Sequence, residues 1–322
     1  MMRWGLLSTA NINGKLLAGA HETDEATVAA VASRDRSRAE AFAREHGIER
    51  AHGSYEALLE DPEIDAVYNP LPNSLHVPWT VRALEAGKHV LCEKPLTRRP
   101  AEAEEAFAAA ERAGRVLEEA FMWRHHPQAQ RLRELLDEGA VGTLRLVQAS
   151  FSHPLTDVGD IRMQGGLDGG SLMDVGCYCL SGTRVVAGAE PERVFAEQVV
   201  GGDDVDVAFA ATLRFPGDVL GSFHCGFSVG RRHHLEAIGD EGSLYLADPW
   251  HGVTPGIEIR REDGVERVEV ERANPYACEL ADFARVVRGE DALRLGAADA
   301  LAQARGIEAL YRSAGSGSAV EL

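Results

Sequence analysis

Two side chains with complementary chemistry stand four residues apart in the segment 169–178, which reads GGSLMDVGCY. If the chain is helical from Ser171 to Val186, as its apolar spacing suggests, Asp174 and Tyr178 share one face. A phenol has a pKa of about 10, too high for a base at neutral pH, but a nearby ammonium group favours the phenolate. A phenolate can take the proton of a hydroxyl while a hydride leaves the carbon that carries this hydroxyl.

Lys94 could supply that ammonium group. It follows an apolar run, 89–92, that predicts a buried strand, and open α/β sheets bind ligands at the carboxyl ends of their strands. We expect Tyr178 to act as acid and base, Lys94 to lower its pKa and bind the reacting oxygen, and Asp174 to hold a neighbouring hydroxyl or orient Lys94. The alternative is structural, because a Lys-Pro pair is usually a solvated loop and Tyr178 could be a core residue.

The start of the chain predicts a nucleotide site. The apolar run 4–7 becomes polar where a first strand would meet its first helix, although Ser8, Ala10 and Asn13 replace the three glycines of the dinucleotide fingerprint. Two hydroxyl groups and the free N–H groups at the helix start still favour an anion. We expect a pyrophosphate to be bound by Ser8, Thr9, Ala10, Asn11 and Ile12.

The end of the next predicted strand, 27–32, indicates which dinucleotide fits. In NAD-binding proteins an acidic residue there contacts the ribose hydroxyls, whereas this chain has Ser33 followed by Arg34. A hydroxyl and a guanidinium suit a 2′-phosphate, so we predict NADP, with NAD as the alternative. Arg34 could instead lie on the surface, and Asp35 could cap a helix or act as the acidic residue.

Strand and helix patterns alternate over the first 120 residues. Buried strands are predicted at 27–32, 64–68 and 89–92, and helices at 37–45, 75–86 and 100–113. This alternation predicts a doubly wound parallel sheet with right-handed crossovers.

Beyond residue 141 the pattern changes, with strands predicted at 144–153, 205–215, 219–229 and 233–239. Pro216-Gly217-Asp218 predicts a hairpin turn between two of them. We expect an antiparallel sheet in an α+β domain, closing helices at 276–287 and 297–312, and a loosely ordered tail at 313–320.

Composition excludes several functional classes. A net charge of −18 opposes binding to nucleic acid. No apolar stretch is long enough to span a membrane, and the N-terminus lacks the pattern of a signal peptide. Five cysteines, an odd number, argue against a disulfide framework, so we expect a cytoplasmic location. The histidine pairs 125–126 and 233–234 do not share a face, so no metal is expected.

Several motifs together resemble the glucose–fructose oxidoreductase / inositol dehydrogenase (Gfo/Idh/MocA) family: PNSLH at 72–76, CEKP at 92–95, EAFMWRHHP at 119–127 and GGSLMDVGCY at 169–178. The resemblance implies a Rossmann domain at 1–122 and a substrate-binding and oligomerisation domain at 123–322 with an open, mainly antiparallel sheet. The C-terminal helices could pack back on the first domain. It also implies nicotinamide chemistry on sugars or related alcohols, in homodimers or homotetramers.

The residue type at position 178 distinguishes branches of the family. Many members have histidine four residues after the motif's aspartate, where this chain has Tyr178. Tyrosine there is similar to the dihydrodiol dehydrogenase, D-xylose dehydrogenase and sugar 3-ketoreductase branches. We expect oxidation of an aldose such as D-xylose or D-glucose at C1. The alternatives are a trans-dihydrodiol, a free or nucleotide-linked ketosugar reduced at C3, or a non-catalytic NADP-sensing regulator. Retention of Lys94, Asp174 and Tyr178 counts against a regulator.

The resemblance implies further contacts around the cofactor. It assigns the loop and helix start after the strand 64–68, together with two more distant side chains: Leu71, Pro72, Asn73, His76, Glu93 and Arg124. The alternatives are a helix cap at Asn73 or Ser74, a structural partner of Lys94 at Glu93, and domain-hinge packing at Arg124. Arg162, which precedes the glycine pair, is expected to reach a sugar hydroxyl or a substrate phosphate.

Overall fold

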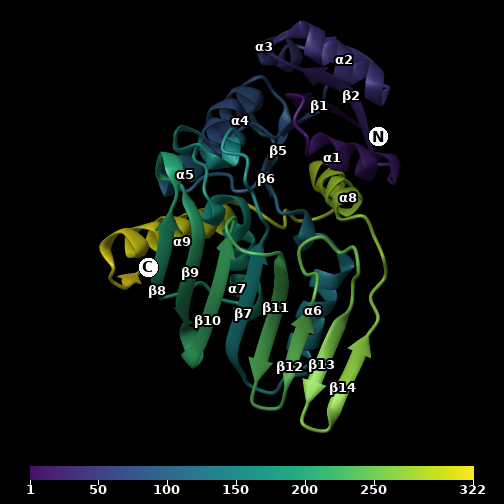
Figure 1. The fold of residues 1–322 in the computed structure, drawn as a ribbon. Helices are drawn as coiled ribbons and strands as arrows, with labels where there is room; N and C mark the ends of the chain where they lie inside the picture. The colour runs from purple at the N-terminus through teal and green to yellow at the C-terminus, as the bar shows by residue number, and fades with distance from the viewer. The chain divides into compact units, whose positions relative to one another are not determined.

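The structure, a computed structural model, describes residues 1–322 and divides into two compact units. Unit 1 contains Met1–Met122 and Asn274–Leu301, and unit 2 contains Trp123–Ala273 and Ala302–Leu322. Figure 1 shows one sheet in each unit.

The sheet of unit 1 has six strands, all parallel, so the predicted doubly wound sheet is confirmed. Their order is β3 (Arg50–His52), β2 (Ala26–Ala32), β1 (Met2–Leu7), β4 (Ala66–Asn69), β5 (His89–Glu93) and β6 (Leu117–Ala120). Apolar runs occur in β1, β2 and β5, because both faces of a parallel sheet are covered by helices.

The helices of unit 1 begin and end at recognisable signals. They are α1 (Asn13–His21), α2 (Arg36–His46), α3 (Tyr55–Leu59), α4 (His76–Glu85), α5 (Pro100–Ala113) and α8 (Pro275–Val287). Gly47 and Gly114 end α2 and α5 in the left-handed conformation. α8 approaches α1 so closely that a Cβ at Gly19 would lie 2.7 Å from the Tyr276 Cβ.

The sheet of unit 2 has nine strands in the order β14 (Gly264–Val268), β13 (Ile257–Arg261), β12 (Ser243–Leu246), β11 (Arg232–Gly239), β7 (Leu144–Ser152), β10 (Val219–Gly226), β9 (Asp206–Phe215), β8 (Arg193–Val200) and β15 (Val320–Glu321). Neighbours are antiparallel except β7 and β10, which are parallel. The mainly antiparallel sheet is therefore confirmed, with one parallel pair at its centre. The hairpin at 216–218 joins β9 to β10 as predicted.

Helices cover one face of this sheet. α6 (Pro127–Asp137), α7 (Cys177–Ala187) and the end of α9 (Ala297–Ser316) lie behind the strands in Figure 1. α9 packs on α7, where Gln303 donates to the Cys177 carbonyl at 2.9 Å. On β8 the buried Val194 alternates with the exposed Phe195, as one covered face requires.

The expectation of a loosely ordered tail is wrong. α9 continues to Ser316, and Val320–Glu321 forms the edge strand β15 against β8. The Ser313 hydroxyl donates to the Ser318 carbonyl at 2.7 Å, which helps to turn the chain into this strand. Small polar residues did not reveal the pairing, because it depends on a partner strand more than 100 residues away.

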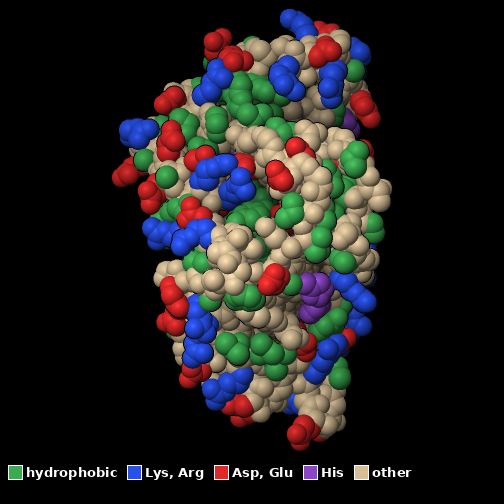
Figure 2. Space-filling view, turned by 60° about the vertical axis from the view of Figure 1, so that its left-hand side comes forward, with side chains coloured by type: hydrophobic (Ala, Val, Ile, Leu, Met, Phe, Trp, Pro, Cys, Tyr) green, Lys and Arg blue, Asp and Glu red, His purple; other side chains and the backbone are tan.

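The surface carries charges of both signs. Acidic and basic side chains are interspersed over the face in Figure 2. The ion pairs of the chain include exposed ones such as Arg36 with Glu40. None of the helices is both long and apolar enough to cross a membrane.

Candidate active site

The first turn of unit 1 is built without glycine. Ser8 follows β1 with a φ of +92°, a conformation that L-residues rarely adopt and that is enriched at functional sites. The buried Asn13 amide closes the turn by donating to the Ser8 carbonyl at 2.8 Å. The Ser8 hydroxyl has no partner in the protein, which fits a turn built to meet a polar ligand.

The end of β2 carries the residues predicted to distinguish NADP from NAD. Asp35 caps α2 by accepting the Ser37 N–H at 2.9 Å, and these hydrogen bonds from Ser37 lower the pKa of Asp35. The alternative that Asp35 is a helix cap is therefore confirmed. The exposed Arg34 lies beside the Tyr55 hydroxyl. Arg38 donates to the Thr9 hydroxyl at 3.5 Å, so a second guanidinium lies at the first turn.

Asn69 holds the loop after β4 in place. Its buried amide donates to the His76 carbonyl at 3.0 Å and to the Thr80 hydroxyl at 3.2 Å, across the start of α4. A single turn of 3-10 helix, Asn73–Leu75, precedes α4, and Leu75, the N-cap residue of α4, makes no side-chain cap hydrogen bond. His76 is buried, and its Nδ1 lies 2.8 Å from the Pro95 carbonyl. His76 thus supports the segment after β5.

Lys94 lies on that segment, which is fixed on both sides. The Lys94–Pro95 peptide bond is cis. Glu93 accepts the Lys94 N–H at 3.1 Å and a short hydrogen bond from the Tyr68 hydroxyl, and burial together with Glu93 raises the pKa of Tyr68. The buried Glu119 accepts the Leu96 N–H at 2.8 Å. These contacts agree with a structural role for Glu93.

Asp174 and Tyr178 lie in unit 2. Asp174 is in a π-helical turn, Leu172–Gly176, that runs into α7, and Tyr178 is in the first turn of α7. The predicted helix is confirmed with this difference, and π turns are frequent at functional sites. The Tyr178 ring is buried, with its centroid 5.3 Å from that of Phe151 and 5.9 Å from that of Trp250.

Two cationic or ionisable side chains surround the Asp174 carboxylate. His153 Nε2, at the end of β7, lies 3.3 Å from Asp174 Oδ2, and an Arg162 terminal nitrogen lies 3.5 Å from the same oxygen. Asp160 anchors Arg162 at 2.8 Å, and this bond is the main reason that the pKa of Arg162 is raised. A carboxylate beside these donors can accept a bond from a substrate hydroxyl while neighbouring groups donate one.

Arg124 lies beside α7, also in unit 2. Its guanidinium donates to the Ser181 hydroxyl at 3.5 Å and lies 5.8 Å from the centroid of the Trp123 ring.

Three residues that the sequence analysis did not single out contact segments that carry predicted site residues, one in unit 1 and two in unit 2. Arg38 lies in the first turn of α2, close after Ser33 and Arg34, and a basic residue so near the predicted 2′-phosphate site is a signal that could have been used. His153 and Asp206 carried no usable signal, because strand pairing brings them to the π turn. Asp206 accepts the Ser171 hydroxyl at 2.6 Å and the Leu172 N–H at 2.7 Å.

Two family descriptions match the chain. The oxidoreductase family with an NAD-binding Rossmann fold matches residues 2–121, and the GFO/IDH/MocA C-terminal domain matches residues 129–245.

Similar proteins agree with this match. A D-xylose 1-dehydrogenase (NADP(+)) of Haloferax volcanii is 39% identical over 100% of both chains. A trans-1,2-dihydrobenzene-1,2-diol dehydrogenase of Bos taurus is 36% identical over 77% of this chain and 75% of its own. Among solved structures, a 3-ketoreductase from Actinomadura kijaniata in complex with NADP and TDP-benzene has a TM-score of 0.91 and 35% identity over 97% of each chain.

Proposed function

The chain belongs to the Gfo/Idh/MocA family of oxidoreductases, and on that premise we propose that it transfers a hydride between NADP(H) and a sugar or cyclic diol. We propose C1 of an aldose such as D-xylose or D-glucose as the reacting carbon. The observation that carries this choice is the similarity, over the full length of both chains, to an NADP-dependent D-xylose dehydrogenase.

The cofactor would be held by residues of unit 1. The strained turn Ser8 to Ile12 would meet the pyrophosphate, and Ser33 with Arg34 would meet the 2′-phosphate. Arg38, beside Thr9, adds a second positive charge for the phosphates. Contacts from Leu71, Pro72, Asn73, His76 and Glu93, and from Arg124 in unit 2, remain predictions. When bound, the nicotinamide ring supplies the hydride acceptor or donor.

Proton transfer would fall to Tyr178. During oxidation the substrate hydroxyl would give its proton to the Tyr178 oxygen as the hydride leaves the carbon that carries this hydroxyl. Reduction would reverse both transfers. Lys94 would favour the phenolate and donate to the reacting oxygen. Asp174, oriented by His153 and Arg162, would accept a hydrogen bond from an adjacent substrate hydroxyl.

A substrate panel tests the reaction. For oxidation, the purified protein is incubated with NADP or NAD and with D-xylose, D-glucose or a trans-dihydrodiol. For reduction, it is incubated with a reduced cofactor and a free or nucleotide-linked 3-ketosugar. The absorbance of the reduced cofactor is followed in both directions. We expect the highest kcat/KM with an aldose and NADP. Faster turnover of the diol or the ketosugar would identify that compound, and not the aldose, as the substrate. Tight NADP binding without turnover of any substrate would favour the regulator.

The variant Tyr178→Phe tests the proton transfer. It removes one oxygen and keeps the ring between Phe151 and Trp250, so we expect kcat to fall by roughly 100-fold or more. The dissociation constant for NADPH, measured by fluorescence titration, should stay within about threefold, because none of the proposed cofactor contacts involves Tyr178. Tyr245→Phe, which alters a tyrosine stacked on Arg260, is the matched control. Near-normal turnover of Tyr178→Phe would remove this residue from the mechanism.

We also propose a homodimer or homotetramer. The uncovered face of the nine-stranded sheet exposes Phe195, Val199 and Leu220, which are apolar side chains that a second copy could cover. Light scattering after gel filtration measures the mass directly. The cytoplasmic location remains a prediction, supported by five cysteines that form no disulfide.

A further inference from the structure

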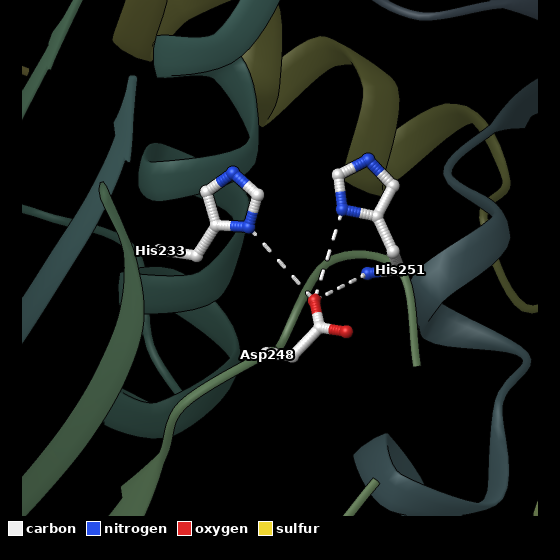
Figure 3. Close-up of side chains that lie close together, drawn as sticks. All are labelled: His233, Asp248 and His251. Carbon is white, nitrogen blue, oxygen red and sulfur yellow. Dashed lines mark hydrogen bonds and ion pairs between the residues drawn. The ribbon is translucent and has the colours of Figure 1, made fainter. Parts of the chain in front are cut away.

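A cluster of two histidines and one aspartate lies in unit 2, apart from the Asp174 carboxylate. His233 comes from β11, Asp248 follows β12, and His251 lies three residues further on. Figure 3 shows both Nδ1 atoms directed toward the same carboxylate. The distances to Asp248 Oδ1 are 3.9 Å from His233 Nδ1 and 3.7 Å from His251 Nδ1.

The three ligand atoms all lie within 4.8 Å of one another. A zinc ion bound at about 2.0–2.2 Å would separate neighbouring ligand atoms by about 3.4 Å in a tetrahedral site. Small rotations of the three side chains would therefore close them around an ion. Two imidazole nitrogens and one carboxylate suit zinc and related transition metals, whereas magnesium and calcium prefer oxygen ligands throughout.

Surrounding groups already orient the three side chains. Asp248 Oδ2 accepts the Val253 N–H at 2.9 Å, which leaves Oδ1 toward the histidines. The Phe151 ring packs edge-on against both imidazoles, with centroids 4.7 Å from His233 and 5.5 Å from His251. His233 Nε2 is buried without a protein partner, so Nδ1 is the nitrogen through which this ring meets Asp248. The side chains are 13%, 14% and 27% exposed for His233, Asp248 and His251, which leaves access for an ion.

We propose that His233, Asp248 and His251 bind one divalent transition-metal ion of the zinc class, with the fourth position filled by water. The ion would tie the loop at 248–254 to β11. That loop carries Trp250, whose ring packs on Tyr178 and whose indole N–H donates to the Ser150 carbonyl at 3.0 Å. The site is a structural one, independent of the proposed reaction. No sequence spacing revealed it, because β11 and the loop are brought together only by the pairing of β11 with β12.

The experiment measures metal uptake by the full chain. The protein is stripped with EDTA, dialysed and titrated with Zn²⁺ by calorimetry, and Co²⁺ is added in parallel to record its visible absorption. We expect one equivalent of Zn²⁺ and the intense d–d bands of a tetrahedral Co²⁺ site. Asp248→Asn and His251→Ala should each weaken Zn²⁺ binding by at least about 100-fold, because losing a ligand costs more than losing an outer partner.

His224→Ala is the matched control, because His224 is an exposed histidine of the same sheet, on β10, which is separated from β11 by β7. It should bind Zn²⁺ as the wild type does. The proposal is wrong if the wild type takes up no stoichiometric Zn²⁺ and shows no cobalt bands. It is equally wrong if Asp248→Asn and His251→Ala, folded by circular dichroism, bind as tightly as the wild type. In either case the cluster is a hydrogen-bonding network alone.

Discussion

At the proposed substrate site, neighbouring side chains orient the Asp174 carboxylate. This carboxylate meets His153 and Arg162, and Arg162 is held in turn by two hydrogen bonds from its Nε and terminal nitrogen to Asp160, at 2.9 and 2.8 Å. A carboxylate oriented in this way loses little freedom when a substrate hydroxyl arrives. In unit 1, Arg38 lies beside Thr9 of the first turn, and both Arg34 and Arg38 lie near Tyr55.

The preference for NADP can be tested at Arg34. If Arg34 binds the 2′-phosphate as proposed, Arg34→Ala should lower kcat/KM for NADP by about 10- to 100-fold, because it removes a charge-assisted hydrogen bond. The value for NAD, which lacks that phosphate, should change by less than about twofold. Arg36→Ala is the control, because Arg36 lies on α2 and pairs with Glu40. Equal losses with both cofactors would contradict the assignment.

At the scale of elements, the π turn before α7 is held by a strand. Asp206, at the start of β9, accepts hydrogen bonds from Ser171, from the Leu172 N–H and, at 2.8 Å, from the Tyr311 hydroxyl of α9. Gly170, with a φ of +118°, makes room for this carboxylate, because a Cβ there would collide with Asp206 Oδ1. The turn that presents Asp174 therefore depends on a carboxylate 32 residues later in the chain.

Asp206→Ala tests this dependence. It leaves a buried hydroxyl and a buried N–H without their acceptor, so we expect a loss of about 2–5 kcal/mol in the free energy of unfolding. Tyr311→Phe removes only one of the three hydrogen bonds and should cost about 1 kcal/mol. Urea unfolding followed by circular dichroism measures both. If the two variants lose equal stability, Asp206 is not the support of the π turn.

Across the whole molecule, burial opposes the protonation of several histidines. Burial and the nearby Arg115 lower the pKa of His89 to about 4, and burial also lowers the pKa of His126 and His234. His89 Nδ1 accepts the Val116 N–H at 3.0 Å, which a protonated ring could not do. Glu279 has the opposite effect on acid stability. Burial and Glu93 raise its pKa, so its protonation favours the folded state as the pH falls.

The acid stability of the protein follows from these shifts. An unfolded histidine has a pKa of about 6.5, so the contribution of His89 is complete above that pH and is lost as the pH falls toward about 4. The wild type should lose up to about 3 kcal/mol more than His89→Asn between about pH 7 and pH 4, because asparagine accepts the same N–H without titrating. Urea midpoints over this range measure the difference, with the exposed His21→Asn as control. Parallel curves for wild type and His89→Asn would contradict the argument.

Local signals predicted most elements of the chain. The bounds of α5 agree with the predicted 100–113 because proline fixes its first turn and Gly114 ends it. The hairpin at 216–218 was predicted from the turn sequence Pro-Gly-Asp, and Gly217 adopts the positive φ that such a turn needs. The strand predicted at 219–229 ends at Gly226, since apolar residues continue past the last hydrogen-bonded pair with β9. β15 was missed because its partner β8 lies far away in the sequence.

The sequence by itself determined the parallel sheet, the second sheet, and the types of group available for hydride transfer: a lysine after a strand, and an aspartate and a tyrosine four residues apart. Periodicity and spacing are local properties, so they can be read along the chain. Only the tertiary structure decided that His153 meets Asp174, that Asp206 holds the π turn, and that His233 faces Asp248 and His251. These contacts follow from the register and order of strands, because a shift of one residue would turn each side chain to the opposite face of the sheet.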